Sequence, residues 1–186
     1  MGGTGTLKAV LFDRDGTLVV DVPYNGDPRL VRPMESARSA VARVRSAGLA
    51  TGVVSNQSGV ARGLLTLPQV HAVNQRVDEL LGPFDVWEVC PHGPGDGCEC
   101  RKPAPGMIHK ACEALRIRPS EAAVIGDIGA DVLAAKAAGA RAVLVPTPVT
   151  REEEIEAADV VANDLWQAVE LLLAAAGPAT TPDAPA

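Results

Sequence analysis

Segments with the pattern of a buried strand alternate with helical segments along almost the whole chain. Short apolar runs such as residues 9–12 are typical of strands covered on both faces. Spacing such as that of Ala37, Val41 and Val44 is typical of a helix with one apolar face. Strands are expected at residues 9–12, 49–54, 84–89, 122–125, 142–145 and 158–161, and helices at residues 35–47, 67–81, 106–115, 130–138 and 165–175. This alternation predicts an α/β fold with a doubly wound, Rossmann-like parallel sheet covered by helices on both faces.

The length and the charge limit what such a domain can do. The chain has 186 residues, which fits a single domain, and a net charge of -6 with 3% aromatic residues argues against a nucleic-acid partner. No run reaches the ~18 apolar residues of a membrane-spanning helix, and the first residues lack the pattern of a secretion signal. We therefore expect a cytoplasmic monomer with no membrane partner, one domain over residues 1–176 and a disordered tail over residues 177–186.

Polar residues follow directly after several of the expected strands. Asp13 and Asp15 follow the first strand, Ser55 and Asn56 the second, a cysteine-containing loop the third, and Asp127 the fourth. In a doubly wound sheet, ligands bind beyond the carboxyl ends of the strands. These side chains are therefore expected to meet in one cleft.

The acidic residues of this cleft predict a magnesium site. Asp13 and Asp15 are two positions apart, so they should project together with Arg14 turned away. Asp127 follows a strand, and Asp131 lies one turn into the next helix. Taken singly, an Asp-Gly turn is common, and Asp131 could simply suit a helix N-terminus. Together they form a set of hard oxygen ligands that suits Mg²⁺.

Carboxylates beside Mg²⁺ point to phosphoryl transfer. Asp13 could attack phosphorus, and Asp15 could act as general acid and then as general base. The transferring group needs donors and cations around its oxygens. Ser55 and Asn56 could donate hydrogen bonds to them, and Lys102 could supply a positive charge. The expected substrate is a small phosphorylated metabolite.

A second set of metal ligands lies in the segment 90–105. Cys90, His92, Cys98 and Cys100 form a C-x-H-x₅-C-x-C pattern, which provides three thiolates and one imidazole. Such a complete tetrahedral set is typical of a structural Zn²⁺ site rather than a catalytic one. Cys112 lies in a helical pattern and is expected to be a small core residue.

The motifs together resemble the haloacid-dehalogenase superfamily of phosphatases over nearly the whole chain. The four matching segments are residues 12–18 (FDRDGTL), residues 54–57 (VSNQ), Lys102, and Gly126-Asp127 with Asp131. The resemblance implies that Asp13 is the nucleophile and Asp15 the acid/base, while Ser55 and Lys102 hold the phosphoryl group. It also implies that Asp13, the carbonyl of Asp15 and Asp127 bind Mg²⁺, with Asp131 in support.

The cysteine segment narrows the resemblance to one group of that superfamily. Residues 55–63 and 90–107 look like those of the D-glycero-D-manno-heptose 1,7-bisphosphate 7-phosphatases, and the histidinol-phosphate phosphatases are the close alternative. These enzymes lack a large cap domain. The resemblance implies that Arg101, Arg62, Tyr24 and Asn25 contact the non-reacting part of the substrate. One departure is Ile128, where the heptose enzymes usually carry lysine.

Two other functions agree less well with the sequence. A phosphatase for nucleic-acid ends would need a basic surface, and the chain has no run of Lys or Arg. A zinc module without enzymatic activity would not need the complete set of acidic residues.

Overall fold

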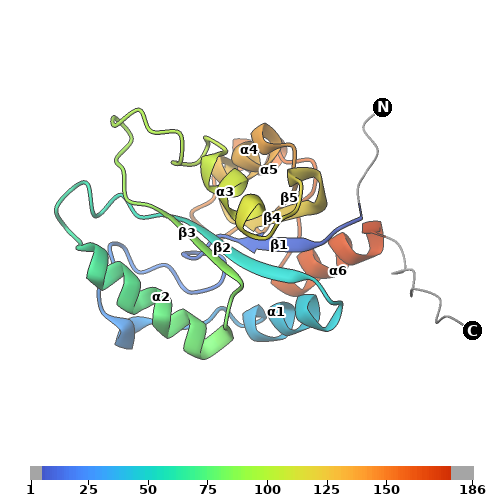
Figure 1. The fold of residues 1–186 in the computed structure, drawn as a ribbon, viewed down its shortest axis with the longest axis horizontal. Coiled ribbons are helices and arrows are strands. Elements are labelled where there is room, and N and C mark those ends of the chain that lie inside the picture. The colour runs from blue at the N-terminus through green and yellow to red at the C-terminus, as the bar shows by residue number, and fades with distance from the viewer. Residues whose placement is uncertain (1–5, 177–186) are drawn as a thin grey trace, which may run out of the picture.

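The computed structural model describes residues 6–176, which form one five-stranded sheet with helices on both sides (Figure 1). The tail expected over residues 177–186 lies outside the described residues. The strands are β1 (Ala9–Phe12), β2 (Ala50–Asn56), β3 (Val86–Cys90), β4 (Ala122–Gly126) and β5 (Arg141–Leu144). The helices are α1 (Ala37–Ser46), α2 (Leu67–Leu81), α3 (Gly106–Ala114), α4 (Gly129–Ala138), α5 (Glu152–Glu156) and α6 (Leu165–Ala176), with short 3₁₀ turns at Pro28–Leu30 and Pro119–Glu121.

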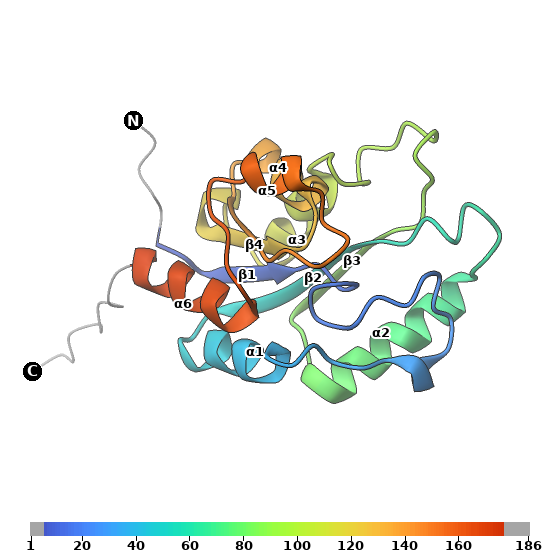
Figure 2. The same cartoon turned by 180° about the vertical axis from the view of Figure 1, so that it is seen from behind.

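All neighbouring strands pair in parallel, in the order β3-β2-β1-β4-β5. Helices α1, α2 and α6 cover one face, and α3 and α4 cover the other (Figure 2). Two apolar cores fill the space between the sheet and these layers, one containing Val41, Val77 and Val169 and the other Met107 and Ile108. The predicted doubly wound parallel fold is confirmed.

Helix α2 shows how local sequence defines an element that borders the site. Thr66 accepts a hydrogen bond from the backbone N–H of Gln69, whose side chain accepts one from the N–H of Thr66 in return. The buried face of α2 consists of Val70, Val73, Asn74, Val77 and Leu81. Asn74 is thus a polar side chain on an otherwise apolar face, and a buried amide requires a partner.

Two expectations about the edges of the sheet need correction. The strand expected over residues 158–161 is only an isolated bridge between Val161 and Leu144, because the chain pairs with β5 at that point alone before α6 begins. The third strand, expected over residues 84–89, begins later than expected. Strand β3 spans Val86–Cys90 at the edge of the sheet, and its three central residues are half-buried. Helix α5 was not expected.

None of the helices within residues 6–176 combines the length and the hydropathy needed to cross a membrane.

Candidate active site

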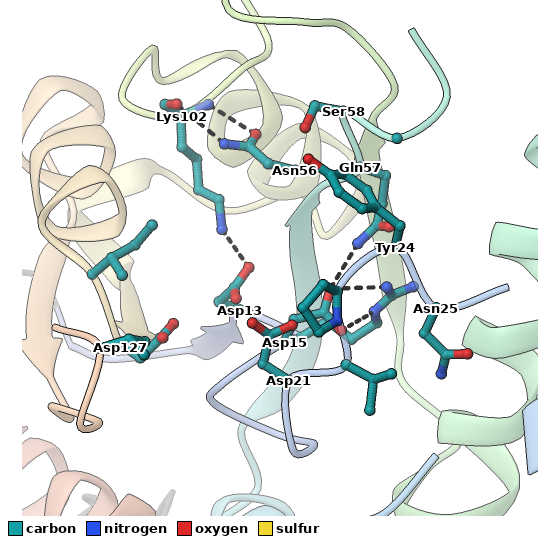
Figure 3. Close-up of a pocket in the computed structure, with 16 residues that line it drawn as sticks. Asp13, Asp15, Asp21, Tyr24, Asn25, Asn56, Gln57, Ser58, Lys102 and Asp127 are labelled. Carbon is teal, nitrogen blue, oxygen red and sulfur yellow. Dashed lines mark hydrogen bonds and ion pairs between the residues drawn. The ribbon is translucent and has the colours of Figure 1, made fainter. Parts of the chain in front are cut away.

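A cavity of about 350 Å³ opens beyond the carboxyl ends of β1, β2 and β4 (Figure 3). It is lined by residues that follow these strands, by the segment 21–25 and by Lys102: Asp13, Arg14, Asp15, Asp21, Val22, Pro23, Tyr24, Asn25, Asn56, Gln57, Ser58, Gly59, Lys102, Asp127, Ile128 and Val149. In Figure 3, Lys102 and Asp127 approach Asp13 from one side, and Asp15 lies on the other. The cavity therefore contains most of the side chains expected to meet in one cleft.

The most acidic part of the cavity surrounds Asp13. Oxygen atoms of Asp13, Asp127 and Asp131 lie within 4.8 Å of one another, and all three residues are buried. The ammonium of Lys102 lies 2.5 Å from Oδ1 of Asp13 and 2.6 Å from Oδ1 of Asp131, and it donates to the carbonyl oxygen of Val54 at 2.8 Å. One cation therefore faces three carboxylates, which leaves negative charge that a divalent metal would balance.

The pKa values in this cluster reflect the same imbalance. Burial raises the pKa of Asp13, although the charge of Lys102 opposes this rise. Burial and the charge of Asp131 raise the pKa of Asp127 to about 7. Burial alone would lower the pKa of Lys102, but Asp13 and Asp131 raise it above its usual value. The donor set is hard oxygen with excess negative charge, so it fits Mg²⁺.

Glycines allow the carboxylates to come this close. Gly16 has a φ of +79°, and a Cβ atom at this position would collide with the carboxylate of Asp127. A Cβ on Gly126 would collide with Asp131 in the same way. Asp127 is held further by the hydroxyl of Thr17, 3.3 Å from its Oδ1, and by that of Thr150, which donates to its main-chain carbonyl at 2.6 Å.

Asn56 fixes the main chain of Lys102. Its Nδ2 donates to the carbonyl of Lys102, and its Oδ1 accepts from the N–H of Lys102, both at 3.1 Å. The amide of Asn56 is thus used to position Lys102. Sequence reasoning assigned it to the substrate.

The carboxylate of Asp15 lies apart from this cluster and has its own partners. Arg14 donates to it with two nitrogens, Nε to Oδ1 at 3.0 Å and Nη2 to Oδ2 at 2.8 Å. The expectation that Arg14 turns away is therefore wrong, because its buried guanidinium folds back onto Asp15. Gln57 bridges Asp15 and Ser55, with its Nε2 at 2.8 Å from Oδ2 of Asp15 and 2.9 Å from the hydroxyl oxygen of Ser55.

The cysteine segment brings its four expected ligands together. Sγ of Cys90 lies 3.6 Å from Nδ1 of His92, 3.7 Å from Sγ of Cys98 and 3.1 Å from Sγ of Cys100. Thiolates bound tetrahedrally to Zn²⁺ at about 2.3 Å would be about 3.8 Å apart; the separation of Cys90 and Cys98 matches this value, and that of Cys90 and Cys100 is shorter. Burial and the neighbouring Cys100 raise the pKa of Cys90 to about 12, which a bound cation would reverse. The donor set fits Zn²⁺. Cys112 lies outside this set and is buried in the core.

The expected substrate contacts are only partly on the cavity wall. Tyr24 and Asn25 line it, whereas Arg62 and Arg101 are not among the lining residues. Arg62 donates to the hydroxyl of Tyr24 at 2.8 Å and lies over its ring, and Arg101 donates to the carbonyl of His92 at 3.3 Å.

Several residues at the site were missed by sequence reasoning. Asp21, Gln57 and Val149 line the cavity, and Asn74 contacts Arg14. Asn74 carried a signal, as a polar residue within an apolar helix face. Gln57 was noted only as part of a motif, and nothing local marks Val149.

The comparisons with known proteins agree with this geometry. A family model described as HAD-hydrolase-like matches residues 99–168. The chain is 38% identical over 143 residues to the D-glycero-beta-D-manno-heptose-1,7-bisphosphate 7-phosphatase of Pseudomonas aeruginosa, covering 74% of this chain and 80% of that protein. It is 36% identical over 182 residues to the enzyme of the same name from Escherichia coli K12, and the match covers 89% of this chain and 95% of that protein.

A solved structure extends the comparison to three dimensions. The D,D-heptose 1,7-bisphosphate phosphatase of B. bronchiseptica, complexed with magnesium and phosphate, superposes with a TM-score of 0.79 and 29% identity. The match covers 91% of this chain and 99% of that one. The chain therefore belongs to the family of haloacid-dehalogenase-like phosphatases that includes the heptose-1,7-bisphosphate 7-phosphatases.

Proposed function

We propose that this protein is a Mg²⁺-dependent phosphomonoester hydrolase that removes the 7-phosphate from D-glycero-β-D-manno-heptose 1,7-bisphosphate. The observation that carries the proposal is the pairing of Asp13 with the buried ammonium of Lys102 inside a cavity that also contains Asp15 and Asp127. The printed names of the curated relatives support the substrate. We also propose that the protein works as a cytoplasmic monomer on this small metabolite.

Asp13 and Asp15 divide the reaction into two displacements. In the first, a carboxylate oxygen of Asp13 attacks phosphorus while the bond to the sugar oxygen breaks, and Asp15 gives that oxygen a proton. In the second, Asp15 takes a proton from water as the water oxygen bonds to phosphorus and the bond to Asp13 breaks. Lys102 lies close enough to Asp13 to offset negative charge on the group being transferred.

Asp13, Asp127 and the carbonyl of Asp15 would hold Mg²⁺, with Asp131 in support. A bound Mg²⁺ would offset charge on the phosphoryl oxygens and on the crowded carboxylates. Cys90, His92, Cys98 and Cys100 would hold Zn²⁺ as a structural ion, because four protein ligands leave no position for substrate.

Two observations favour a second substrate, histidinol phosphate. Asp21 lines the cavity and is not among the catalytic residues proposed above, and it could pair with a substrate amine. Ile128 also lines the cavity, and it offers no charge to a second phosphate.

Phosphate release with Mg²⁺ from the two substrates, measured side by side, tests the proposal. We expect kcat/KM for the heptose bisphosphate to exceed that for histidinol phosphate by ~100-fold or more. The reverse preference would assign the site to the amine-bearing substrate. If the protein hydrolyses neither of these two substrates nor an aryl phosphate, the proposed chemistry is wrong.

A further inference from the structure

The side chain of Arg14 connects the acid/base residue to helix α2. Arg14 is 1% exposed, and its guanidinium donates to two side chains through three different nitrogens. Two of them bind the two oxygens of Asp15, and the third, Nη1, donates to Oδ1 of Asn74 at 2.7 Å. Asn74 belongs to the buried face of α2, so its hydrogen bond attaches the guanidinium to this helix on the side away from Asp15.

We propose that Arg14 is a positioning residue that, braced by Asn74, fixes the carboxylate of Asp15 for both proton transfers. The inference rests on the proposed function, since it assumes that Asp15 exchanges the protons. A guanidinium that binds both oxygens of a carboxylate fixes its plane as well as its position, which a single point charge would not do. The orientation of Asp15 is therefore set before substrate binds.

The hydrogen bonds also distinguish the two oxygens of Asp15. Oδ2 accepts from Arg14 and from Gln57, while Oδ1 accepts from Arg14 alone. Each carboxylate oxygen has two lone pairs, so these contacts occupy both on Oδ2 and leave one on Oδ1. We assign the exchanged proton to Oδ1. Its bond to Oδ1 breaks as the sugar oxygen takes the proton and the P–O bond cleaves, and it re-forms when water attacks the phosphoryl group on Asp13.

The test uses the dependence of kcat/KM on the leaving group. A sugar alkoxide needs a proton to leave, whereas p-nitrophenolate is a much weaker base and leaves without one. The water attack on the aspartyl phosphate is common to both substrates, but kcat/KM reports only the steps up to departure of the leaving group. A badly oriented Asp15 should therefore lower kcat/KM for the heptose bisphosphate far more than kcat/KM for p-nitrophenyl phosphate. General damage to the site would slow both reactions alike.

We expect Arg14→Gln to lower kcat/KM on the sugar phosphate by about 100-fold and on p-nitrophenyl phosphate by less than about 5-fold. Arg14→Lys, which keeps the charge without the two-pronged geometry, should restore only part of the loss. Asn74→Leu keeps Arg14 but removes the side chain that holds its guanidinium. It should lower kcat/KM less than Arg14→Gln does, and again mainly on the sugar phosphate. This variant keeps the proposal testable if Arg14→Gln does not fold. The matched control is Arg43→Gln, which breaks the surface ion pair with Glu170 and should leave both activities within twofold of wild type.

Equal losses on the two substrates in Arg14→Gln and Asn74→Leu, or no loss in either, would overturn the positioning role. Asp15→Asn separates this failure from that of the proposed function. If Asp15→Asn loses sugar-phosphate activity selectively and the Arg14 and Asn74 variants do not, only the positioning role is wrong. If Asp15→Asn shows no selective loss, the acid/base assignment is wrong, and the role of Arg14 falls with it.

Discussion

The ammonium nitrogen of Lys102 lies 2.5 Å from Oδ1 of Asp13, although the two residues are 89 positions apart in the chain. Asp13 follows β1, and Lys102 comes from the cysteine segment that follows β3. The pair therefore links the first strand of the sheet to the predicted zinc site. It also connects the two proposed metal sites, because Asp13 belongs to the magnesium site and Lys102 follows the zinc ligand Cys100.

Removing the charge of Lys102 should impair both stability and activity. Lys102→Gln leaves Asp13 and Asp131 buried without their cation, and breaking a buried ion pair from one side costs about 3 kcal/mol of unfolding free energy. Losing the positive charge beside the phosphoryl group should lower kcat by about 100-fold or more. Denaturant unfolding and phosphate release measure the two effects. Lys110→Gln, at an exposed position, is the control, and a similar loss in both variants would refute the specific role of Lys102.

Loss of zinc should impair the active site, because the chain that follows Cys100 carries Lys102. Lys102 lies two residues beyond Cys100, so a disordered segment 90–105 would release its ammonium from Asp13. We expect Cys100→Ser, or removal of zinc with a chelator followed by assay in excess Mg²⁺, to lower the melting temperature and the activity together. Metal analysis should find about one zinc per wild-type chain. Cys112→Ala, which changes a cysteine outside the cluster, should keep the zinc. A fall in melting temperature with full activity would show that the segment does not position Lys102.

The stability contributed by Glu121 should depend on pH. Hydrogen bonds from the side chain and backbone of Arg118, and from Lys8, lower its pKa from 4.5 to about 2. A lowered pKa in the folded state means that the ionised form stabilises the fold. The contribution is complete above about pH 4.5 and disappears as the pH falls toward 2.

The unfolding free energies of wild type and Glu121→Gln should therefore differ at pH 7 and converge only at about pH 2 or below. Glu79→Gln, which removes the exposed ion pair with Arg76, should change stability much less at pH 7. A difference between wild type and Glu121→Gln that does not vary with pH would contradict the assignment.

The sequence predicted the sheet and most of the acidic site because both depend on order along the chain. Strand ends at Asp13 and Asp127 could be inferred from apolar runs, and parallel pairing then brings those ends to one edge. The cysteine spacing predicted the ligand cluster for the same reason. The zinc ion itself stays a prediction.

The contacts of long side chains could not be predicted from the sequence in this way. Alternation along a strand indicates where Arg14 leaves the backbone, but its guanidinium lies several bonds further on and folds back to Asp15. The partners of Asn56 and Asn74 lie far away in sequence and depend on how the loops pack. The strand expected over residues 158–161 was wrong because Val160 and Val161 are apolar yet about 40% exposed, so hydrophobicity alone suggested a strand there.

The measurement that tests the account most directly is phosphate release from the heptose bisphosphate with Mg²⁺ by wild-type protein and by Asp13→Asn. The amide is nearly isosteric with the carboxylate but cannot attack phosphorus, so we expect a loss of at least about 10⁴-fold with an unchanged circular dichroism spectrum. Wild-type turnover with an inactive, folded variant is the predicted result. Activity of folded Asp13→Asn within tenfold of wild type would contradict the account.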